Sequence, residues 1–110
     1  MDCIFCKIAN GEIPSKKVYE DEHTLAFYDL DPQAPVPVLV IPKEHMQSIE
    51  DEKSEGAAKH LFHAVRMVAK ELELADGFRC VINTGRDGGQ TVGHLHIHVL
   101  GKRSLKWPPG

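Results

Sequence analysis

The hydrophobic pattern of the chain changes period along its length, and these changes outline the expected elements. Short apolar stretches separated by prolines, glycines or acidic turns predict strands near residues 13–19, 24–29, 38–41, 78–84 and 94–100. Between about residues 52 and 74 the apolar positions recur at helical spacing with charged residues opposite them, which predicts one long amphipathic helix. We therefore expect an α+β fold, an antiparallel sheet of about five strands with this helix packed on it.

Chain length and charge narrow the class of protein. With 110 residues, of which 42% are hydrophobic, the chain can bury one core, so we expect a single domain over residues 1–110. A net charge of −3 gives no general attraction for nucleic acid. No apolar run approaches the ~20 residues of a membrane span, and the chain does not start with a basic and apolar leader. These features favour a cytoplasmic protein with no nucleic-acid or membrane partner.

The three cysteines fit a reducing compartment better than a disulfide framework. Cys80 lies inside the apolar run of residues 78–82, so we expect it to be a buried core thiol. Cys3 and Cys6 form the one close pair, and two thiolates supply half of a tetrahedral zinc site. From the spacing alone, a zinc site and a pair of free thiols both stay open.

Residues 94–98 read His-Leu-His-Ile-His, and this alternation fits an extended strand. Side chains alternate between the faces of a strand, so His94, His96 and His98 would share one face while the aliphatic residues enter the core. Imidazoles titrate near pH ~6.5 and can act as nucleophiles, proton donors or metal ligands. The preceding residues 87–93 are glycine-rich, which lets backbone N–H groups approach an anion. Together they predict a histidine platform beside a phosphate cradle.

Two other interpretations of the three histidines stay open. They could lie on a surface strand without chemistry, or they could form an open catalytic zinc site. The glycine-rich loop favours phosphate chemistry over a simple metal site, because three metal ligands do not need an anion cradle beside them. In such chemistry a neutral imidazole nitrogen attacks phosphorus and forms a P–N bond that water later hydrolyses. The second ring nitrogen must then be held by an acceptor, so that the attacking nitrogen carries the lone pair.

At the level of motifs, residues 94–100 match the His-φ-His-φ-His-φ-φ signature (φ, hydrophobic) of the histidine-triad (HIT) superfamily. The resemblance extends through residues 3–8, 27–29, 32–35, 40–43, 83, 88–90 and 107–110, which together span nearly the whole chain. The Gly-Gly-Gln loop and the Trp-Pro-Pro-Gly tail resemble the Hint-like branch, whose members hydrolyse purine nucleoside phosphoramidates.

This resemblance implies a HIT-like fold and a nucleotide-binding hydrolase that acts as a homodimer. The hydrolase would cleave the P–N bond of AMP-type or GMP-type phosphoramidates, and its catalysis would require no cofactor. A nucleotide- and zinc-binding module with weak catalysis, or a dinucleoside polyphosphate hydrolase, are the alternatives.

The resemblance also assigns roles to individual residues. His96 would be the nucleophile that is transiently nucleotidylated, His98 would contact the α-phosphate and the leaving group, and His94 would complete the catalytic triad. The expected substrate contacts run from the phosphate to the base: Gly89, Gln90 and Thr91 at the phosphate, Asn83 at phosphate and ribose, Asp29 at the ribose, and Phe5, Ile8, Phe27 and Leu30 around the purine. Trp107 would approach the site of the partner subunit. For the apolar residues of this set, an ordinary core is the alternative.

Some bacterial HIT proteins complete the zinc site of the cysteine pair with two histidines, which correspond here to His45 and His94. The implied ligands of a structural zinc are therefore Cys3, Cys6, His45 and His94. Hint-type proteins commonly carry a histidine eight positions before His45 that supports the first triad member, and here that position is Pro37. A proline cannot relay a proton, so we expect the support of His94 to differ in this chain, and zinc could take its place.

Overall fold

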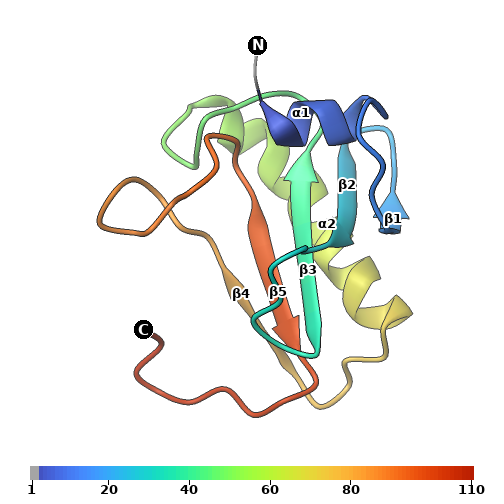
Figure 1. The fold of residues 1–110 in the computed structure, drawn as a ribbon, viewed down its shortest axis with the longest axis vertical. Coiled ribbons are helices and arrows are strands. Elements are labelled where there is room, and N and C mark those ends of the chain that lie inside the picture. Colours follow the sequence, from blue (N-terminus) through green and yellow to red (C-terminus); the bar gives the residue numbers. More distant parts are fainter. Residues whose placement is uncertain (1–2) are drawn as a thin grey trace.

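The computed structural model describes residues 3–110 and shows a five-stranded antiparallel sheet with the strand order β1-β2-β3-β5-β4 (Figure 1). The strands are β1 (Lys17–Glu20), β2 (Thr24–Tyr28), β3 (Val36–Pro42), β4 (Phe78–Val81) and β5 (Ile97–Gly101). The sheet and its helix confirm the predicted α+β fold. Strand β3 is buried along its whole length, as expected for the central strand of a sheet covered on both faces.

The long helix α2 (Lys53–Glu71) covers one face of the sheet, over β1, β2 and β3. Its buried side chains, which recur at helical spacing, are Ser54, Leu61, Ala64, Val65 and Val68. They join a core cluster that includes β3 and β5 residues, among them Val40 and Val99. The helix therefore confirms the prediction from the period of the sequence, with ends a few residues inside the expected range. No helix within residues 3–110 combines the length and apolar character needed to cross a membrane.

A short helix, α1 (Ile4–Ala9), covers the opposite face near one end of the sheet (Figure 1). Its buried residues Phe5 and Ile8 pack in a second core cluster with residues of β2 and β3. Cys3 caps the helix, because its Sγ accepts a hydrogen bond from the Cys6 N–H at 3.3 Å. The sequence did not predict α1, since six residues are too few to show a helical period.

The histidine segment is less regular than predicted, because β5 begins only at Ile97. The expected alternation nevertheless holds along it. Leu95 and Ile97 lie in the core cluster beneath α2, whereas the rings of His94 and His96 contact Phe5 of α1, at centroid distances of 6.0 and 5.1 Å. The two faces of this one segment therefore serve the core and the site separately.

The expectation of a buried Cys80 is wrong, because its side chain is exposed. Cys80 pairs with Val99 on the face of the sheet that α2 covers, but α2 packs mainly over β1, β2 and β3, away from β4. Strand β4 is at the edge of the sheet, so its apolar positions on that face have no cover.

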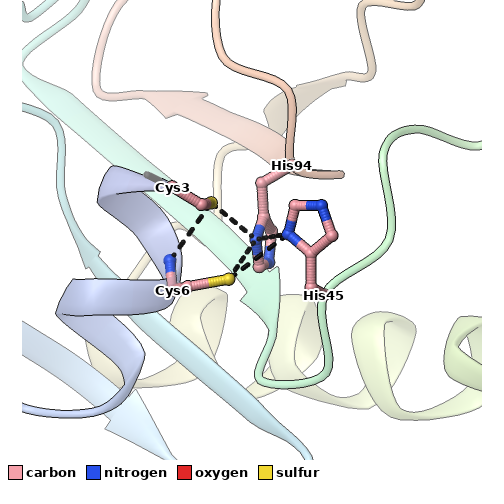
Figure 2. Close-up of side chains that lie close together, drawn as sticks. All are labelled: Cys3, Cys6, His45 and His94. Atoms are coloured by element: carbon pink, nitrogen blue, oxygen red, sulfur yellow. Dashed lines mark hydrogen bonds between the residues drawn. The ribbon is translucent and has the colours of Figure 1, made fainter. Parts of the chain in front are cut away.

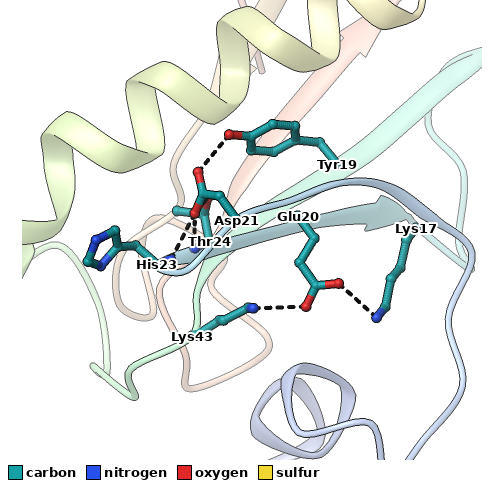
Figure 3. Close-up of polar contacts among 7 residues, drawn as sticks. All are labelled: Lys17, Tyr19, Glu20, Asp21, His23, Thr24 and Lys43. Carbon is teal, nitrogen blue, oxygen red and sulfur yellow. Dashed lines mark hydrogen bonds and ion pairs between the residues drawn. The ribbon is translucent and has the colours of Figure 1, made fainter.

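The turn between β1 and β2 is organised by one carboxylate (Figure 3). Asp21 Oδ1 accepts hydrogen bonds from the His23 N–H and from both the N–H and the hydroxyl of Thr24, each at 2.8 Å. Asp21 Oδ2 accepts the Tyr19 hydroxyl at 2.7 Å. Partial burial favours a raised pKa for Asp21, but the bonds from Tyr19, His23 and Thr24 outweigh it and hold the pKa well below its ordinary value.

Asp21→Asn is expected to lower the free energy of unfolding at pH 7 by about 1–2 kcal/mol, because a half-buried charged acceptor is lost. Because the pKa of Asp21 is lower in the folded protein, its ionised form stabilises the fold above the unfolded pKa near ~3.9. This stabilisation is lost as the pH falls from that value toward the pKa in the folded protein. The stability of the variant should therefore fall less steeply than that of the parent between about pH 5 and pH 2. Urea unfolding across this range measures both effects, with the exposed Asp76→Asn as control. Equal acid slopes in parent and Asp21→Asn would contradict the prediction.

Candidate functional site

Four potential metal ligands from distant parts of the chain meet beside α1 (Figure 2). Cys3 is the N-cap of α1 and Cys6 lies within it, His45 follows β3, and His94 precedes β5. Cys3 Sγ lies 3.3 Å from His94 Nδ1, and Cys6 Sγ lies 3.3 Å from His45 Nδ1 and 3.5 Å from His94 Nδ1. The two Nδ1 atoms are 3.2 Å apart. All four donor atoms lie within 4.8 Å of one another.

These separations fit a tetrahedral zinc ion. Zn–S bonds of about 2.3 Å and Zn–N bonds of about 2.1 Å would place neighbouring ligand atoms about 3.3–3.8 Å apart. The protonation of His94 also fits. Its Nε2 lies 2.8 Å from the Pro42 carbonyl, which can only accept, so Nε2 carries the proton and the neutral ring presents the Nδ1 lone pair to the cluster. Burial lowers the pKa of His94, which keeps the ring neutral.

The Pro42 carbonyl also settles what supports His94 in this chain. Pro37 lies opposite Leu100 in the β3–β5 register, toward the end of β3 that is farther from Pro42. It is therefore not beside the His94 ring, and the missing histidine at this position leaves no gap there. Both ring nitrogens of His94 are engaged, one by the carbonyl and one by the cluster, so the ring is oriented as a metal ligand would be.

His96 has the geometry that a histidine nucleophile needs. His96 is only 5% exposed, and the ring centroids of Phe5 and His98 each lie 5.1 Å from that of His96. His96 Nδ1 lies 2.7 Å from the backbone carbonyl of His94, so Nδ1 must carry the proton and donate it. The lone pair is then on Nε2. The ring of His94 thus joins the cysteine–histidine cluster, and the backbone carbonyl of His94 holds the ring of His96.

His98 is half-buried and lines a cleft together with Asn83. Burial lowers the pKa of His98, the neighbouring His96 lowers it further, and Asp29 acts in the opposite direction. Asp29 itself is fixed by two backbone bonds, because its Oδ1 accepts the Asp31 N–H at 3.0 Å and its own N–H donates to the Pro37 carbonyl at 2.8 Å. The structure therefore brings Asn83 and Asp29 into the neighbourhood of His98.

The glycine-rich loop is held together mainly by its own bonds. The Gly89 and Gln90 N–H groups donate to carbonyls of the same loop. The Gln90 side chain accepts from the Gly85 N–H and donates to the carbonyls of Gln47 and Val92. The side chain of Gln90 therefore stabilises the loop, and its expected phosphate contact stays a prediction. Thr91 is exposed and lines a cavity with Cys3 and His45, on the metal side of the loop.

The residues expected around a purine are divided by the structure. Phe5, Ile8 and Phe27 are only 6%, 6% and 3% exposed and form part of the core cluster beneath α1. Leu30 is 96% exposed on the loop after β2, and Trp107 is 81% exposed in the tail. Phe5, Ile8 and Phe27 are therefore mainly core residues, as the alternative interpretation implied, and only a small part of each is accessible to a base. Leu30 does not pack with them.

Sequence reasoning missed two features of the site. The Pro42 carbonyl that fixes His94 is a backbone group, and no residue pattern marks it. The cleft beside His98 carries three cations, Arg79, Arg103 and Lys106, from segments that meet only in the fold. The spacing of Arg79 two residues before Val81 and four before Asn83, which predicts one shared strand face, was the available signal for one of them.

The fold, the metal-type cluster and the histidine segment together define a protein of the histidine-triad class. A model of the HIT domain family matches residues 10–105, and the chain belongs to this family.

Solved structures of related proteins agree with this assignment. A histidine triad protein from Clostridium difficile is 51% identical, with a TM-score of 0.92 over 96% of this chain and 95% of that chain. A HIT family hydrolase from Legionella pneumophila is 43% identical, with a TM-score of 0.94 over 99% of this chain and 100% of that chain. Among curated relatives, a 14 kDa zinc-binding protein from Zea mays is 46% identical, over 97% of this chain and 87% of the relative.

We expect the purified protein to bind about one zinc ion per chain and Cys6→Ser to lose it, because three ligands remain. At a hundredfold excess over Kd, zinc would add about 2.7 kcal/mol to the free energy of unfolding. Metal analysis and thermal unfolding with and without a chelator measure both effects. Cys80→Ser, which removes an exposed thiol outside the cluster, is the matched control. Equal zinc content in the two variants would exclude the site.

Proposed function

We propose that this protein is a purine nucleoside phosphoramidase of the Hint-like branch. It would cleave the P–N bond of AMP-type or GMP-type phosphoramidates and release a nucleoside monophosphate and an amine. The observation that carries this proposal is the bond from His96 Nδ1 to the His94 carbonyl, which leaves the Nε2 lone pair for attack. The hydrolase among the solved relatives supports the reaction class. The cytoplasm, where thiolate ligands stay reduced, is the proposed setting.

In the first step, the Nε2 lone pair of His96 forms a bond to the α-phosphorus. The P–N bond of the substrate breaks, its electron pair stays on the departing nitrogen, and that nitrogen takes up a proton. His98 lies beside His96 and lines the adjoining cleft, so it is placed to deliver this proton. An anionic phosphate beside the ring raises the pKa that burial had lowered, which favours the protonated form when substrate is bound.

In the second step, a water molecule attacks the phosphorus of the His96 adduct. The bond between phosphorus and Nε2 breaks, its electron pair returns to Nε2, and the proton of the water leaves through His98. The proton taken up in the first step is thereby restored. Asp29 would accept the ribose hydroxyls and Asn83 would contact ribose and phosphate, since both are placed around His98.

Zinc has a structural role in this proposal. Cys3, Cys6, His45 and His94 would hold the ion, and the ion when bound supplies a fixed cross-link among them. His94 then presents its carbonyl to His96 from a fixed position, so the cluster contributes to the orientation of the nucleophile and takes no part in the bond changes.

A homodimer joined through β4 completes the proposal. Strand β4 is at the sheet edge (Figure 1). Its residues Phe78 and Cys80 and the adjoining Ile82 are exposed. Phe62 on α2 is also 68% exposed. An unpaired edge strand with an apolar face favours pairing with a second copy.

The test of the reaction is turnover of adenosine 5'-phosphoramidate. His96→Ala is expected to lower kcat by about three orders of magnitude or more, because the nucleophile is lost. Intact mass during the parent reaction should show a transient AMP adduct that is absent from His96→Ala. His63→Ala, an exposed histidine of α2, is the control and should retain full activity.

The same assay separates the alternatives. AMP binding without turnover or adduct would replace the enzyme with a nucleotide-binding module. Faster cleavage of a dinucleoside polyphosphate than of the phosphoramidate would place the protein in a different branch of the family.

Cys80→Asp is expected to weaken the dimer, because it would bury an unpaired charge in the proposed interface. The dissociation constant from sedimentation equilibrium should rise about a hundredfold or more. Ile49→Asp, at a residue that is 49% exposed and distant from β4 in sequence, serves as control. A parent protein that stays monomeric at high concentration would refute the interface.

A further inference from the structure

Resting on the proposed function, we propose that the preferred leaving group is an amine that carries an anionic group, such as the carboxylate of an amino acid. Arg79, Arg103 and Lys106 would receive this anion in the cleft that begins at His98. The site would then recognise both ends of the substrate, the nucleotide through Asp29 and the amine through its negative charge.

The cleft has a volume of about 400 Å³ and lies between the β4–β5 surface, the loop after β2 and the C-terminal tail. The residues that line the cleft extend from His98 to the three cations. Val81 lies opposite His98 and Arg79 opposite Leu100, so Arg79 is two residues farther along the same face. At about 3.3 Å per residue, that step is roughly 7 Å, which is the reach of a small amino acid beyond the phosphorus.

The charges in the cleft are of one sign. Its lining residues include three cations and no acidic side chain, although the whole chain has a net charge of −3. The ion pairs found within residues 3–110 involve other cations, Lys17, Lys43, Lys53 and Arg86. An anion entering the cleft would therefore meet positive charge that no described carboxylate neutralises.

The arginine contacts leave donors for a ligand. Arg79 Nη2 donates to the Lys106 carbonyl at 3.0 Å, and Arg103 donates through Nη2 to the Gln33 carbonyl at 3.0 Å and through Nη1 to the Ser104 carbonyl at 3.3 Å. A guanidinium has five N–H groups, and its fork geometry matches a carboxylate. These bonds hold the tail and the loop after β2 around the cleft, and the remaining N–H groups can bind an anion.

The proposed role of His98 directs the amine toward this cleft. The amine leaves on the side of the phosphorus opposite Nε2, because attack and departure are in line. In the proposed reaction His98 delivers the proton to the departing nitrogen, and His98 lines the cleft. A group carried by the amine can therefore extend from His98 toward Arg79 and Arg103.

The experiment compares two substrates of similar size, the adenosine 5'-phosphoramidates of glycine, which carries a carboxylate, and of glycinamide, which carries a neutral amide. The ratio of their kcat/KM values is measured for the parent, Arg79→Gln and Arg103→Gln. The intrinsic difference between the two leaving amines is the same for every protein, so a change in the ratio between proteins reports the cleft alone. We expect each substitution to lower the preference for the glycine substrate about tenfold.

Two further variants serve as controls. Arg66→Gln, on the exposed side of α2, should leave the ratio unchanged. Arg103→Lys keeps the charge and should retain part of the preference for the glycine substrate. If a substitution acted only by displacing the tail, kcat/KM would fall equally for both substrates.

The outcomes are distinguishable from those of the proposed function. Turnover of both substrates with a ratio that neither arginine substitution changes would overturn the anionic leaving group and leave the phosphoramidase intact. If the parent turns over neither substrate, the phosphoramidase fails, and calorimetric binding to His96→Ala tests the cleft without catalysis. Tighter binding of the glycine compound, lost in the double variant with Arg103→Gln, would still support the anion site, and equal binding of both compounds would refute it.

Discussion

The commitment of His94 to two partners at once is the constraint on which the site depends. Its ring is fully buried and engaged on both nitrogens, by the Pro42 carbonyl and by the cysteine–histidine cluster. A buried imidazole without partners would be costly, and here every polar atom of the ring has one. Because the ring cannot rotate without breaking these contacts, the His94 carbonyl is held in place, and the tautomer of His96 follows from that carbonyl.

The two faces of the sheet have different roles in this arrangement. Beneath α2, residues such as Leu95 and Val99 fill an apolar core. On the opposite face, α1 contributes Phe5 to the packing of His94 and His96, and Cys6 of α1 and its N-cap Cys3 belong to the cluster. The short helix and its cap therefore cover the core and supply half of the potential metal ligands. The stability of this end of the sheet and the orientation of the nucleophile depend on the same contacts.

How much could be predicted from the sequence follows from the range of each interaction. The strands, the long helix and the alternation of the histidine segment are local patterns, and the structure confirms them. The helix α1 was too short to be visible, and Cys80 was misplaced because the extent of α2 over the sheet is not encoded near residue 80. The positions of Gln90 and Leu30 depend on loop conformation. The role of the Pro42 carbonyl and the cation cleft could not be predicted, because both depend on the strand register that brings distant segments together.

The order of features along the sheet separates what must stay fixed from what can vary. The metal cluster lies at the α1 end, His96 and His98 follow, and the cations lie beyond them along β4 and β5. In the proposed reaction, His96 acts on the phosphorus, which every substrate shares, and the cluster only orients His96. In this proposal the cations Arg79, Arg103 and Lys106 would contact the departing amine, and the two arginines also donate to backbone carbonyls of the tail and of the loop after β2. A change of charge there can alter the preferred amine while the bonds that orient His96 remain intact, so specificity and chemistry are physically separable in this fold.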